Sequence, residues 1–429
     1  MQRNFPQKRL GLLLASLLCT LPVQAAVTFI GEGSIPGTAT DQSGLTGLLE
    51  DGVTPHNLIG GLGSALAYTG KGQRYIATPD RGPADGATSY IDRIYQLDIK
   101  LKQQSANQYL VEPTVTRTTL MRQARKSYFT GSAAAFDAVN SPDSLRFDPE
   151  GVRVSRCGHS AFVSDEYGPF VYEFDLESGK RLRSVNLPNK FLTDFPSVTP
   201  SVELAQNASG RQSNRGMEGL AITPDGRKLL GIMQSPLLQD GGLDAAAKRV
   251  GTNIRIAEID VESGAVREFL YALDKKGNGV SEILAVNEHE LLVLERDGKP
   301  GAEAAEKKIF KIDISAATDI RGIKQLPQTG MPVGVTPVTK SLFLNLLDPA
   351  HGLAGASFPE KIEGLAFGPD LADGRHLLLV VNDNDFVATQ PTRVFAFAID
   401  GYELPGFQAQ QVHAEHSGEC RKEKERADD

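Results

Sequence analysis

The sequence lacks tryptophan, has only three cysteines and seven histidines, and contains no apolar run long enough to span a membrane. The longest apolar run, "LGLLLASLLCTL", has about 12 residues, whereas a transmembrane helix needs about 20. The histidines form no H-E-x-x-H pair and the cysteines have no metal-ligand spacing, which argues against a zinc site. Gly-x-Ser-x-Gly, P-loop and dinucleotide-binding motifs are also missing, so the sequence excludes these common sites.

Positive charge is also scarce: 45 Lys and Arg stand against 53 Asp and Glu, for a formal net charge of −8. An acidic chain lacks the excess of positive charge that is typical of nucleic-acid binding. We therefore expect no nucleic-acid partner and favour metal ions or cationic groups as partners. The 43 glycines, 24 prolines and 40% hydrophobic residues are typical of a folded, turn-rich protein, and 429 residues are ample for a core.

The N-terminus has the pattern of a secretory signal peptide. Three basic residues, the last of them Arg9, precede the apolar run, and the small residues Val23 and Ala25 occupy the cleavage positions. We therefore expect residues 1–25 to be removed and the mature chain to be exported, periplasmic or extracellular. Leu18 before Cys19 is too large for a lipoprotein signal, so no membrane anchor is expected after cleavage.

Cleavage would leave Cys157 and Cys420, an even pair in an oxidising compartment. The sequence leaves two possibilities open at this point: a disulfide between these cysteines, or two free thiols. The charged ending "CRKEKERADD" is typical of a mobile tail, which we place at residues 411–429.

Five segments of the chain share one pattern. A small or acidic pair opens a short apolar strand, a polar turn follows, and a longer apolar strand ends in a polar or charged pair. The segments are "SALAYTGKGQRYIATPD" (64–80), "EGVRVSRCGHSAFVSDE" (150–166), "EGLAITPDGRKLLGIMQ" (218–234), "EILAVNEHELLVLER" (282–296) and "EGLAFGPDLADGRHLLLVVND" (363–383). Their spacing exceeds that of solenoid repeats and fits elaborated propeller blades.

A third strand follows each segment, such as "RIYQLDI" or "RVFAFAID", and a fourth follows most, such as "RLRSVNL". The last unit lacks a fourth strand, which the mature N-terminal "AVTFIGEG" could supply to close the ring. The pattern predicts an all-β protein, a β-propeller of four-stranded blades over residues 26–410. Five blades are counted directly, and a sixth could lie in residues 27–60 or 100–148. A β-sandwich, the main rival, does not explain so constant a hairpin.

In a blade, the start of the first strand and the end of the antiparallel second strand lie on one face. We therefore expect the ends of the five hairpins to meet at one mouth of the central channel. The first strands begin at Ser64, Glu150, Glu218, Glu282 and Glu363. The second strands end at Asp80 and Arg81, Asp165 and Glu166, Gln234, Glu295 and Arg296, and Asn382 and Asp383.

A ring of carboxylates is electrostatically costly, because each negative charge raises the pKa of its neighbours. Hard oxygen ligands suit Ca²⁺ or another divalent metal. The candidate metal ligands are Glu150, Glu218, Glu282, Glu363 and Asp383. The alternative interpretation is structural: each Glu could accept hydrogen bonds from backbone amides and Arg side chains, and so tie blades together.

Three runs carry a resemblance to a known family: "NRGMEGLAITPDGRKLLGIMQSPLLQDGG", "VSEILAVNEHELLVLERDG" and "KIEGLAFGPDLADGRHLLLVVNDNDF". Together they resemble the phytase-like, "esterase-like activity of phytase" family of exported bacterial proteins, over roughly residues 55 to 400. The resemblance implies a β-propeller and a hydrolase of phosphoester or carboxylic ester bonds.

The leading hypothesis is metal-assisted hydrolysis of a small-molecule ester by a monomer. Glu166 or Glu295 would act as general base, and Arg81, Arg215 or Arg296 would bind the anionic substrate. Two alternatives remain open: a non-catalytic envelope propeller that binds partners, and a lactonase-like metal-dependent propeller.

Overall fold

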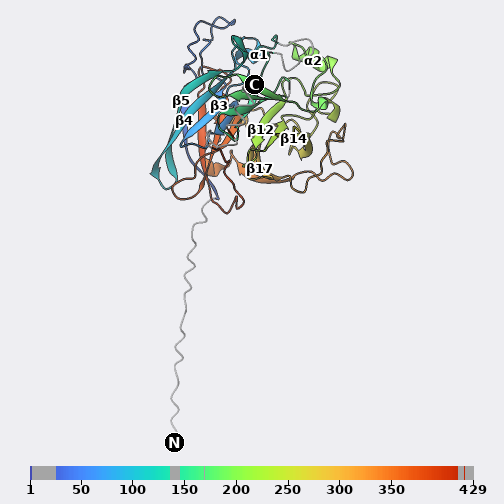
Figure 1. The fold of residues 1–429 in the computed structure, drawn as a ribbon. Helices are drawn as coiled ribbons and strands as arrows, with labels where there is room; N and C mark the ends of the chain where they lie inside the picture. The colour runs from blue at the N-terminus through green and yellow to red at the C-terminus, as the bar shows by residue number, and fades with distance from the viewer. Residues whose placement is uncertain (2–25, 136–144, 169, 414–419, 421–429) are drawn as a thin grey trace.

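The computed structural model describes residue 1 and residues 26–135, 145–168, 170–413 and 420 (Figure 1). Apart from Met1, the expected signal peptide lies outside these residues, as does most of the expected tail. In the part of the chain that is described, no helix combines the length and the apolar character needed to cross a membrane.

Five four-stranded antiparallel sheets make up the molecule, and they are the blades of a β-propeller. The first strands of blades 1 to 5 are β2 (Ala65–Tyr68), β8 (Pro149–Val154), β12 (Met217–Ile222), β16 (Gly279–Ala285) and β20 (Ile362–Phe367). The second strands are β3 (Arg74–Thr78), β9 (Ser160–Asp165), β13 (Lys228–Met233), β17 (Glu290–Arg296) and β21 (His376–Asn382). All five hairpins predicted from the repeat are thereby confirmed.

The two outer positions of each blade are also filled. The third strands are β4 (Arg93–Ser105), β10 (Val171–Asp175), β14 (Asn253–Asp260), β18 (Lys307–Asp313) and β22 (Thr392–Ile399). The outermost strands are β5 (Gln108–Leu120), β11 (Arg181–Val185), β15 (Val266–Ala272), β19 (Thr339–Asn345) and, in blade 5, β1 (Val27–Ile35).

The ring is closed by the N-terminal strand, as predicted. β1 pairs antiparallel with β22, from Val27 opposite Ile399 to Ile35 opposite Thr392. The first strands contact one another in the cyclic order β2, β8, β12, β16, β20 and back to β2, so they surround one central channel.

No sixth four-stranded sheet is present among the described residues. Residues 27–60 supply β1 and connecting loops, and residues 100–135 complete the long β4–β5 hairpin and the small hairpin of β6 (Arg122–Ala124) and β7 (Ser127–Tyr128). Helices are few and short: α1 (Pro83–Gly86) and α2 (Pro200–Gln206), and the 3-10 turns η1 (Leu62–Ser64), η2 (Asn189–Phe191), η3 (Leu238–Asp240), η4 (Gly301–Glu303) and η5 (Pro349–His351). α1 and α2 both lie at the top of Figure 1.

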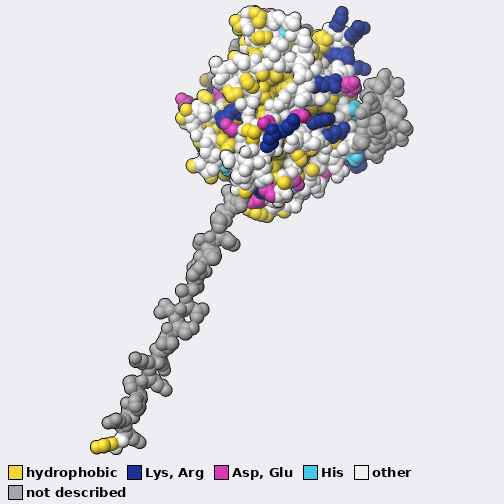
Figure 2. All heavy atoms as spheres, turned by 90° about the vertical axis from the view of Figure 1, so that its left-hand side faces the viewer, with side chains coloured by type: hydrophobic (Ala, Val, Ile, Leu, Met, Phe, Trp, Pro, Cys, Tyr) yellow, Lys and Arg dark blue, Asp and Glu magenta, His cyan; other side chains and the backbone are white. Residues whose placement is uncertain are grey.

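Apolar side chains fill the spaces between neighbouring blades and hold them together. One buried cluster joins blades 3 and 4 through residues such as Leu220 and Ile283, and another joins blades 1 and 5 through Leu66 and Val381. Each cluster contains side chains from adjacent blades, so the blades share their apolar core. On the face shown in Figure 2, basic and acidic side chains lie close to one another among apolar ones.

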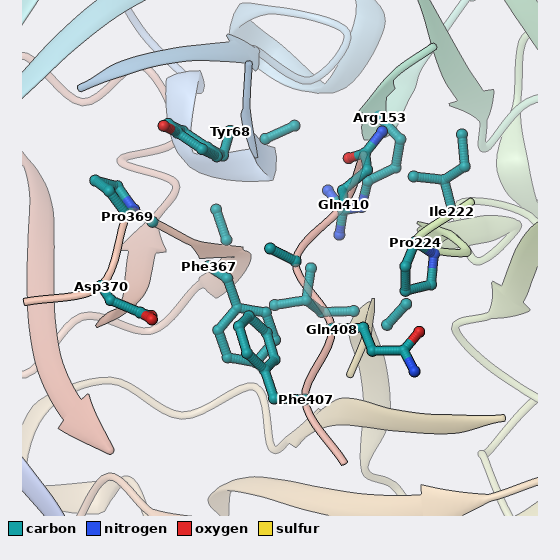
Figure 3. A pocket seen from close by; sticks show the side chains of 16 residues that line it. Tyr68, Arg153, Ile222, Pro224, Phe367, Pro369, Asp370, Phe407, Gln408 and Gln410 are labelled. Carbon is teal, nitrogen blue, oxygen red and sulfur yellow. The ribbon is translucent and has the colours of Figure 1, made fainter. Parts of the chain in front are cut away.

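The C-terminal segment crosses the end of the channel opposite the hairpin ends. Residues 404–413, here called the strap, bind the turns of three blades: the backbone amides of Gln408, Gln411 and His413 donate to carbonyls of Val286, Pro224 and Arg156. Below the strap is a mostly apolar cavity of about 180 Å³, to which all five first strands contribute (Figure 3).

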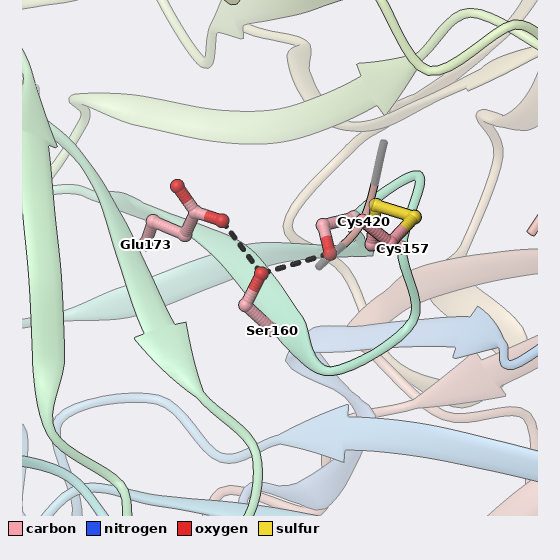
Figure 4. The surroundings of a disulfide bond; sticks show 5 residues. Cys157, Ser160, Glu173 and Cys420 are labelled. Carbon is pink, nitrogen blue, oxygen red and sulfur yellow. Dashed lines mark hydrogen bonds between the residues drawn. A yellow bond between two sulfur atoms is a disulfide. The ribbon is translucent and has the colours of Figure 1, made fainter. Parts of the chain in front are cut away.

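A disulfide joins Cys420 to Cys157, with a Cα to Cα distance of 5.4 Å (Figure 4). This settles the pairing that the sequence left open. Cys157 lies in the turn between β8 and β9, so the bond ties Cys420 to blade 2.

Candidate functional site

The opposite end of the channel opens into a polar cavity of about 210 Å³, here called the mouth. Nine of the residues expected at the mouth from the sequence line it: Asp80, Arg81, Glu150, Glu166, Arg215, Glu218, Gln234, Arg296 and Glu363. The structure thus brings together residues separated by up to 283 positions in the chain, counting from Asp80 to Glu363.

A β-bulge turns the carboxylates of the first strands toward the cavity. The pairing of β12 with β13 shifts between Met217 and Gly219, and that of β20 with β21 shifts between Ile362 and Gly364. The extra residue in each strand, Glu218 or Glu363, is left out of the ladder. A similar irregularity in β8 leaves Glu150 unpaired.

Glu282 lies deeper in the channel than predicted. The bulge in β16 leaves Ser281, not Glu282, at the position equivalent to Glu218, because the shift falls between Val280 and Glu282. Glu282 is fully buried, its Oε1 accepts from the amides of Leu220 (3.1 Å) and its own neighbour Ile283 (2.9 Å), and it does not line the mouth. Its place is structural, which corrects the expectation that it joins the mouth.

Glu295 also lies away from the mouth. It precedes Arg296 on β17, and adjacent strand residues face opposite sides. Arg296 points into the mouth, whereas Glu295 is buried between blades 3 and 4, where it accepts from Tyr271 Oη at 3.0 Å and Lys340 Nζ at 2.7 Å. This enclosed carboxylate has no route to a substrate at the mouth, so it does not fit the predicted role of general base.

Arg81 holds two of the acids at the mouth in place. Its Nη1 donates to Asp148 Oδ2 at 2.7 Å and to Glu166 Oε2 at 3.3 Å, and its backbone amide donates to Asp148 Oδ1 at 3.0 Å. Burial raises the pKa of Asp148 to about 7 even though the Arg81 charge opposes that shift. Arg81 therefore joins blade 1 to blade 2 beneath the cavity.

Among the buried carboxylates that line the mouth, Glu150 is the one without a partner. It is 7% exposed, and its side chain makes no hydrogen bond or ion pair with any residue in the described part of the chain. Burial raises its pKa well above the ordinary value, and the negative charges of Glu218, Asp148 and Glu166 raise it further. An acid in this position gains from a cation that the protein itself does not supply.

Only one of the two carboxylate oxygens of Glu218 is hydrogen-bonded. Its Oε1 accepts from Gln234 Nε2 at 2.5 Å, while Oε2 is buried without a hydrogen bond. Burial raises the pKa of Glu218, and the charges of Glu166 and Glu363 add to that effect.

Glu363 is bound by Arg296. Arg296 Nη2 lies 2.5 Å from Glu363 Oε1, and its Nε donates to Ser281 Oγ at 2.8 Å. This pair joins blade 4 to blade 5, as the structural interpretation of the acids had expected for such residues.

Asp383 belongs to a separate acidic group with Asp80 and Asp385. Lys361, which the sequence reasoning missed, already supplies a cation there: its Nζ lies 2.8 Å from Asp385, 3.1 Å from Asp383 and 3.5 Å from Asp80. The amine therefore already offsets part of the negative charge of this group.

The donor set around Glu150 fits a divalent cation better. Carboxylate oxygens of Asp148, Glu150 and Glu166 lie within 4.8 Å of one another, and all three residues are buried. Hard oxygen donors with this charge suit Ca²⁺ or Mg²⁺. Arg81 offsets Asp148 and Glu166 but leaves Glu150 and the Oε2 of Glu218 uncompensated.

Two arginines complete the mouth. Arg215 was predicted there, whereas Arg249 was not, because it lies in the irregular loop after β13, where no strand pattern marks a position. Neither side chain forms a hydrogen bond or ion pair with another residue that the structure describes. The mouth therefore combines unpaired carboxylates and unpaired guanidinium groups in one cavity.

Comparisons with known proteins give one curated relative and several distant structures. An "Uncharacterized secreted protein" of the fungus Arthroderma benhamiae is 27% identical over 297 residues, which is 56% of this chain and 54% of the relative. The chain thus spans about half the length of this relative.

Among solved structures, Myxococcus xanthus glutaminyl cyclase matches with 12% identity and a TM-score of 0.36, covering 87% of this chain and 97% of that one. A putative 6-phosphogluconolactonase of Bacteroides uniformis matches with 11% identity and a TM-score of 0.33, covering 83% and 93%. TM-scores this low carry no argument about function.

The model of one family matches residues 57–386, which is most of the chain and includes all five first-strand and second-strand hairpins up to the end of β21. The repeat, the propeller and this match agree, and the chain belongs to the phytase-like family, described as "Esterase-like activity of phytase".

Proposed function

We propose that this protein is an exported, monomeric hydrolase that cleaves a phosphoester or carboxylic ester of a small molecule at the channel mouth, with the help of a divalent cation such as Ca²⁺. The observation that carries the proposal is the buried and unpartnered carboxylate of Glu150, beside Asp148 and Glu166. Membership of the phytase-like family and a relative described as secreted support hydrolysis and export. A bacterial source stays a prediction from the sequence.

Glu150, Asp148 and Glu166 would hold the cation, and Glu218 lines the same cavity. When bound, a divalent cation polarises an ester oxygen and lowers the pKa of a coordinated water. Glu218 is then the acid best placed to take a proton, because its Oε2 has no partner within the described residues. Arg81 keeps Asp148 and Glu166 in their present orientation through its two ion pairs.

Hydrolysis of p-nitrophenyl esters and p-nitrophenyl phosphate, with calcium and with EDTA, tests the proposal. We expect turnover that EDTA abolishes and calcium restores. Absence of metal-dependent turnover on these substrates and on phytate would overturn it.

One observation favours a non-catalytic binding module as the second candidate. The ion pairs Arg81–Asp148, Arg296–Glu363 and Lys361–Asp80 join neighbouring blades through charged side chains in and around the mouth. On this interpretation, Glu150→Gln would change stability or ligand binding, and no substrate of any ester class would be turned over.

A further inference from the structure

A second cavity, of about 320 Å³, adjoins the mouth. It shares four lining residues with the mouth: Arg81, Asn214, Arg215 and Arg249. Its other walls come from α2, from Tyr167 and from the loop that contains Leu243 and Ala247. A ligand bound at the mouth could therefore extend directly into this side cavity.

Two tight loops bring Arg215 and Arg249 to the boundary between the cavities. Arg215 closes a short turn with Gln212, in which Asn214 adopts a left-handed φ of 56°. Arg249 pairs with Leu243 across a loop in which Ala247 has a φ of 58°. Non-glycine residues with such backbone angles are uncommon and are held by their surroundings.

Neither arginine forms an ion pair with another residue that the structure describes. Arg296, whose charge also acts on Arg249, is itself bound to Glu363. The two acids that line the side cavity are also engaged: Glu203 lies 2.6 Å from Arg211, and the exposed Asp85 lies 3.5 Å from Arg81. Burial lowers the pKa of Arg249 to about 10, and the charges of Arg215 and Arg296 lower it further.

Two residues that line the side cavity each have a buried polar atom without a partner. Arg81 Nε and Gln212 Oε1 make no hydrogen bond, although their residues are only 6% and 1% exposed. The Gln212 amide is oriented by its Nε2, which donates to the carbonyl of Pro236 at 2.7 Å, so Oε1 remains an open acceptor. Buried polar atoms without partners are costly unless a ligand or water satisfies them.

We infer that Arg215 and Arg249 form an anion subsite, which binds a carboxylate or phosphoryl group of the substrate other than the ester that is cleaved. Two guanidinium groups at one boundary suit such a group, because each offers a fork of N–H donors. Gln212 Oε1 would accept from a hydroxyl beside the anionic group. The role of the subsite in turnover rests on the proposed function, but its ability to bind an anion does not.

Isothermal titration calorimetry with sodium phosphate, and separately with sodium acetate, tests the subsite. The titrations use the mature oxidised protein in EDTA at low salt, so that no metal contributes. The variants are Arg215→Gln, Arg249→Gln and the double variant. Arg74→Gln is the matched control, because Arg74 is exposed, makes no ion pair with another described residue, and begins β3 at the end of the channel away from the mouth.

We expect wild type and Arg74→Gln to bind one or both anions equally well. Each single variant should bind about tenfold more weakly, as loss of a charge-assisted hydrogen bond implies, and the double variant should show no binding. Binding of phosphate alone would assign the subsite to phosphoryl groups, and binding of acetate alone to carboxylates. The inference is overturned if neither anion binds wild type, or if the double variant keeps wild-type affinity.

Glu150→Gln separates this inference from the proposed function. The variant should lose metal-dependent hydrolysis and keep anion binding. If wild type binds anions through these arginines but hydrolyses no substrate, the anion subsite is supported and the proposed hydrolase function is rejected. If a glutamine variant fails to fold, Arg215→Lys and Arg249→Lys replace it and should bind more weakly than wild type, because lysine keeps the charge but lacks the fork of donors.

Discussion

Arg153 of β8 and Glu282 of β16 form an ion pair across the central channel, with Nη2 3.0 Å from Oε2, although blade 3 stands between their blades. Both side chains are buried. Arg153 also donates to the carbonyls of Leu66 at 3.0 Å and Ile283 at 2.9 Å, so one guanidinium group links blades 1, 2 and 4.

Loss of this pair should destabilise the ring strongly. Arg153→Met leaves the Glu282 carboxylate buried without a cation, and breaking a buried pair in this way costs about 3 to 5 kcal/mol. Urea denaturation followed by circular dichroism measures the loss. Adding Glu282→Gln to Arg153→Met should recover part of it, and a double variant less stable than the single one would contradict this account.

Glu150→Gln should weaken calcium binding by about tenfold or more, because it removes a charged oxygen ligand. In EDTA the same variant should be more stable than wild type at pH 8, since a buried and unpaired charge is gone. Calcium titration by calorimetry and thermal unfolding in EDTA check the two effects. Glu262→Gln, at an exposed turn, is the matched control and should change neither.

Stability without metal should fall as the pH rises from 5 to 8. Burial raises the pKa values of Asp148 and Asp165 from 3.8 to about 7. The native state therefore keeps protons that the unfolded chain releases, and the free energy of unfolding declines between about pH 4 and pH 7. Thermal unfolding in EDTA across this range should show a falling midpoint. A midpoint that rises toward pH 8 would show that these carboxyl groups do not control stability.

Calcium should counter this decline. A cation at Glu150, Asp148 and Glu166 favours their charged forms, so the increase in midpoint caused by calcium should be larger at pH 8 than at pH 5. An equal increase at both pH values would argue against these ligands.

Replacing both Cys157 and Cys420 by serine should lower the free energy of unfolding by about 2 to 5 kcal/mol, in the range found for native disulfides. The strap should also become easier to cleave, since its remaining attachments are mainly backbone hydrogen bonds and Gln410 Nε2 to Val154. Urea denaturation and limited proteolysis with mass spectrometry measure the two effects. Wild type in reductant should behave like the variant, and resistance of its strap to cleavage would count against the anchoring role.

The architecture could be predicted from the sequence because the blade hairpin recurs five times, and each copy repeats the order of apolar strand, polar turn and apolar strand. The same repetition located Glu150, Glu218 and Glu363 at the mouth. The prediction was wrong for Glu282. In β16 the bulged residue is Ser281, one position before the acid, and adjacent residues of a strand point to opposite sides.

The rest of the site depends on single residues without a periodic signal. Lys361 precedes β20 and Arg249 lies in a loop, so no alternation marks either of them. The partner of Glu295 is likewise not visible in the sequence: Tyr271 belongs to the neighbouring blade, and only packing brings the two together. Side-chain direction and contacts between blades are therefore the parts that need the structure.

The placement of Glu150 in the channel has a kinetic consequence. The Arg153–Glu282 pair joins β8 to β16 across the channel, and the strap lies across the end away from the mouth. Glu150 is reached from the mouth, whose cavity it lines. If the mouth is catalytic, product and substrate bind in the same cavity of the free enzyme, so product inhibition should be competitive.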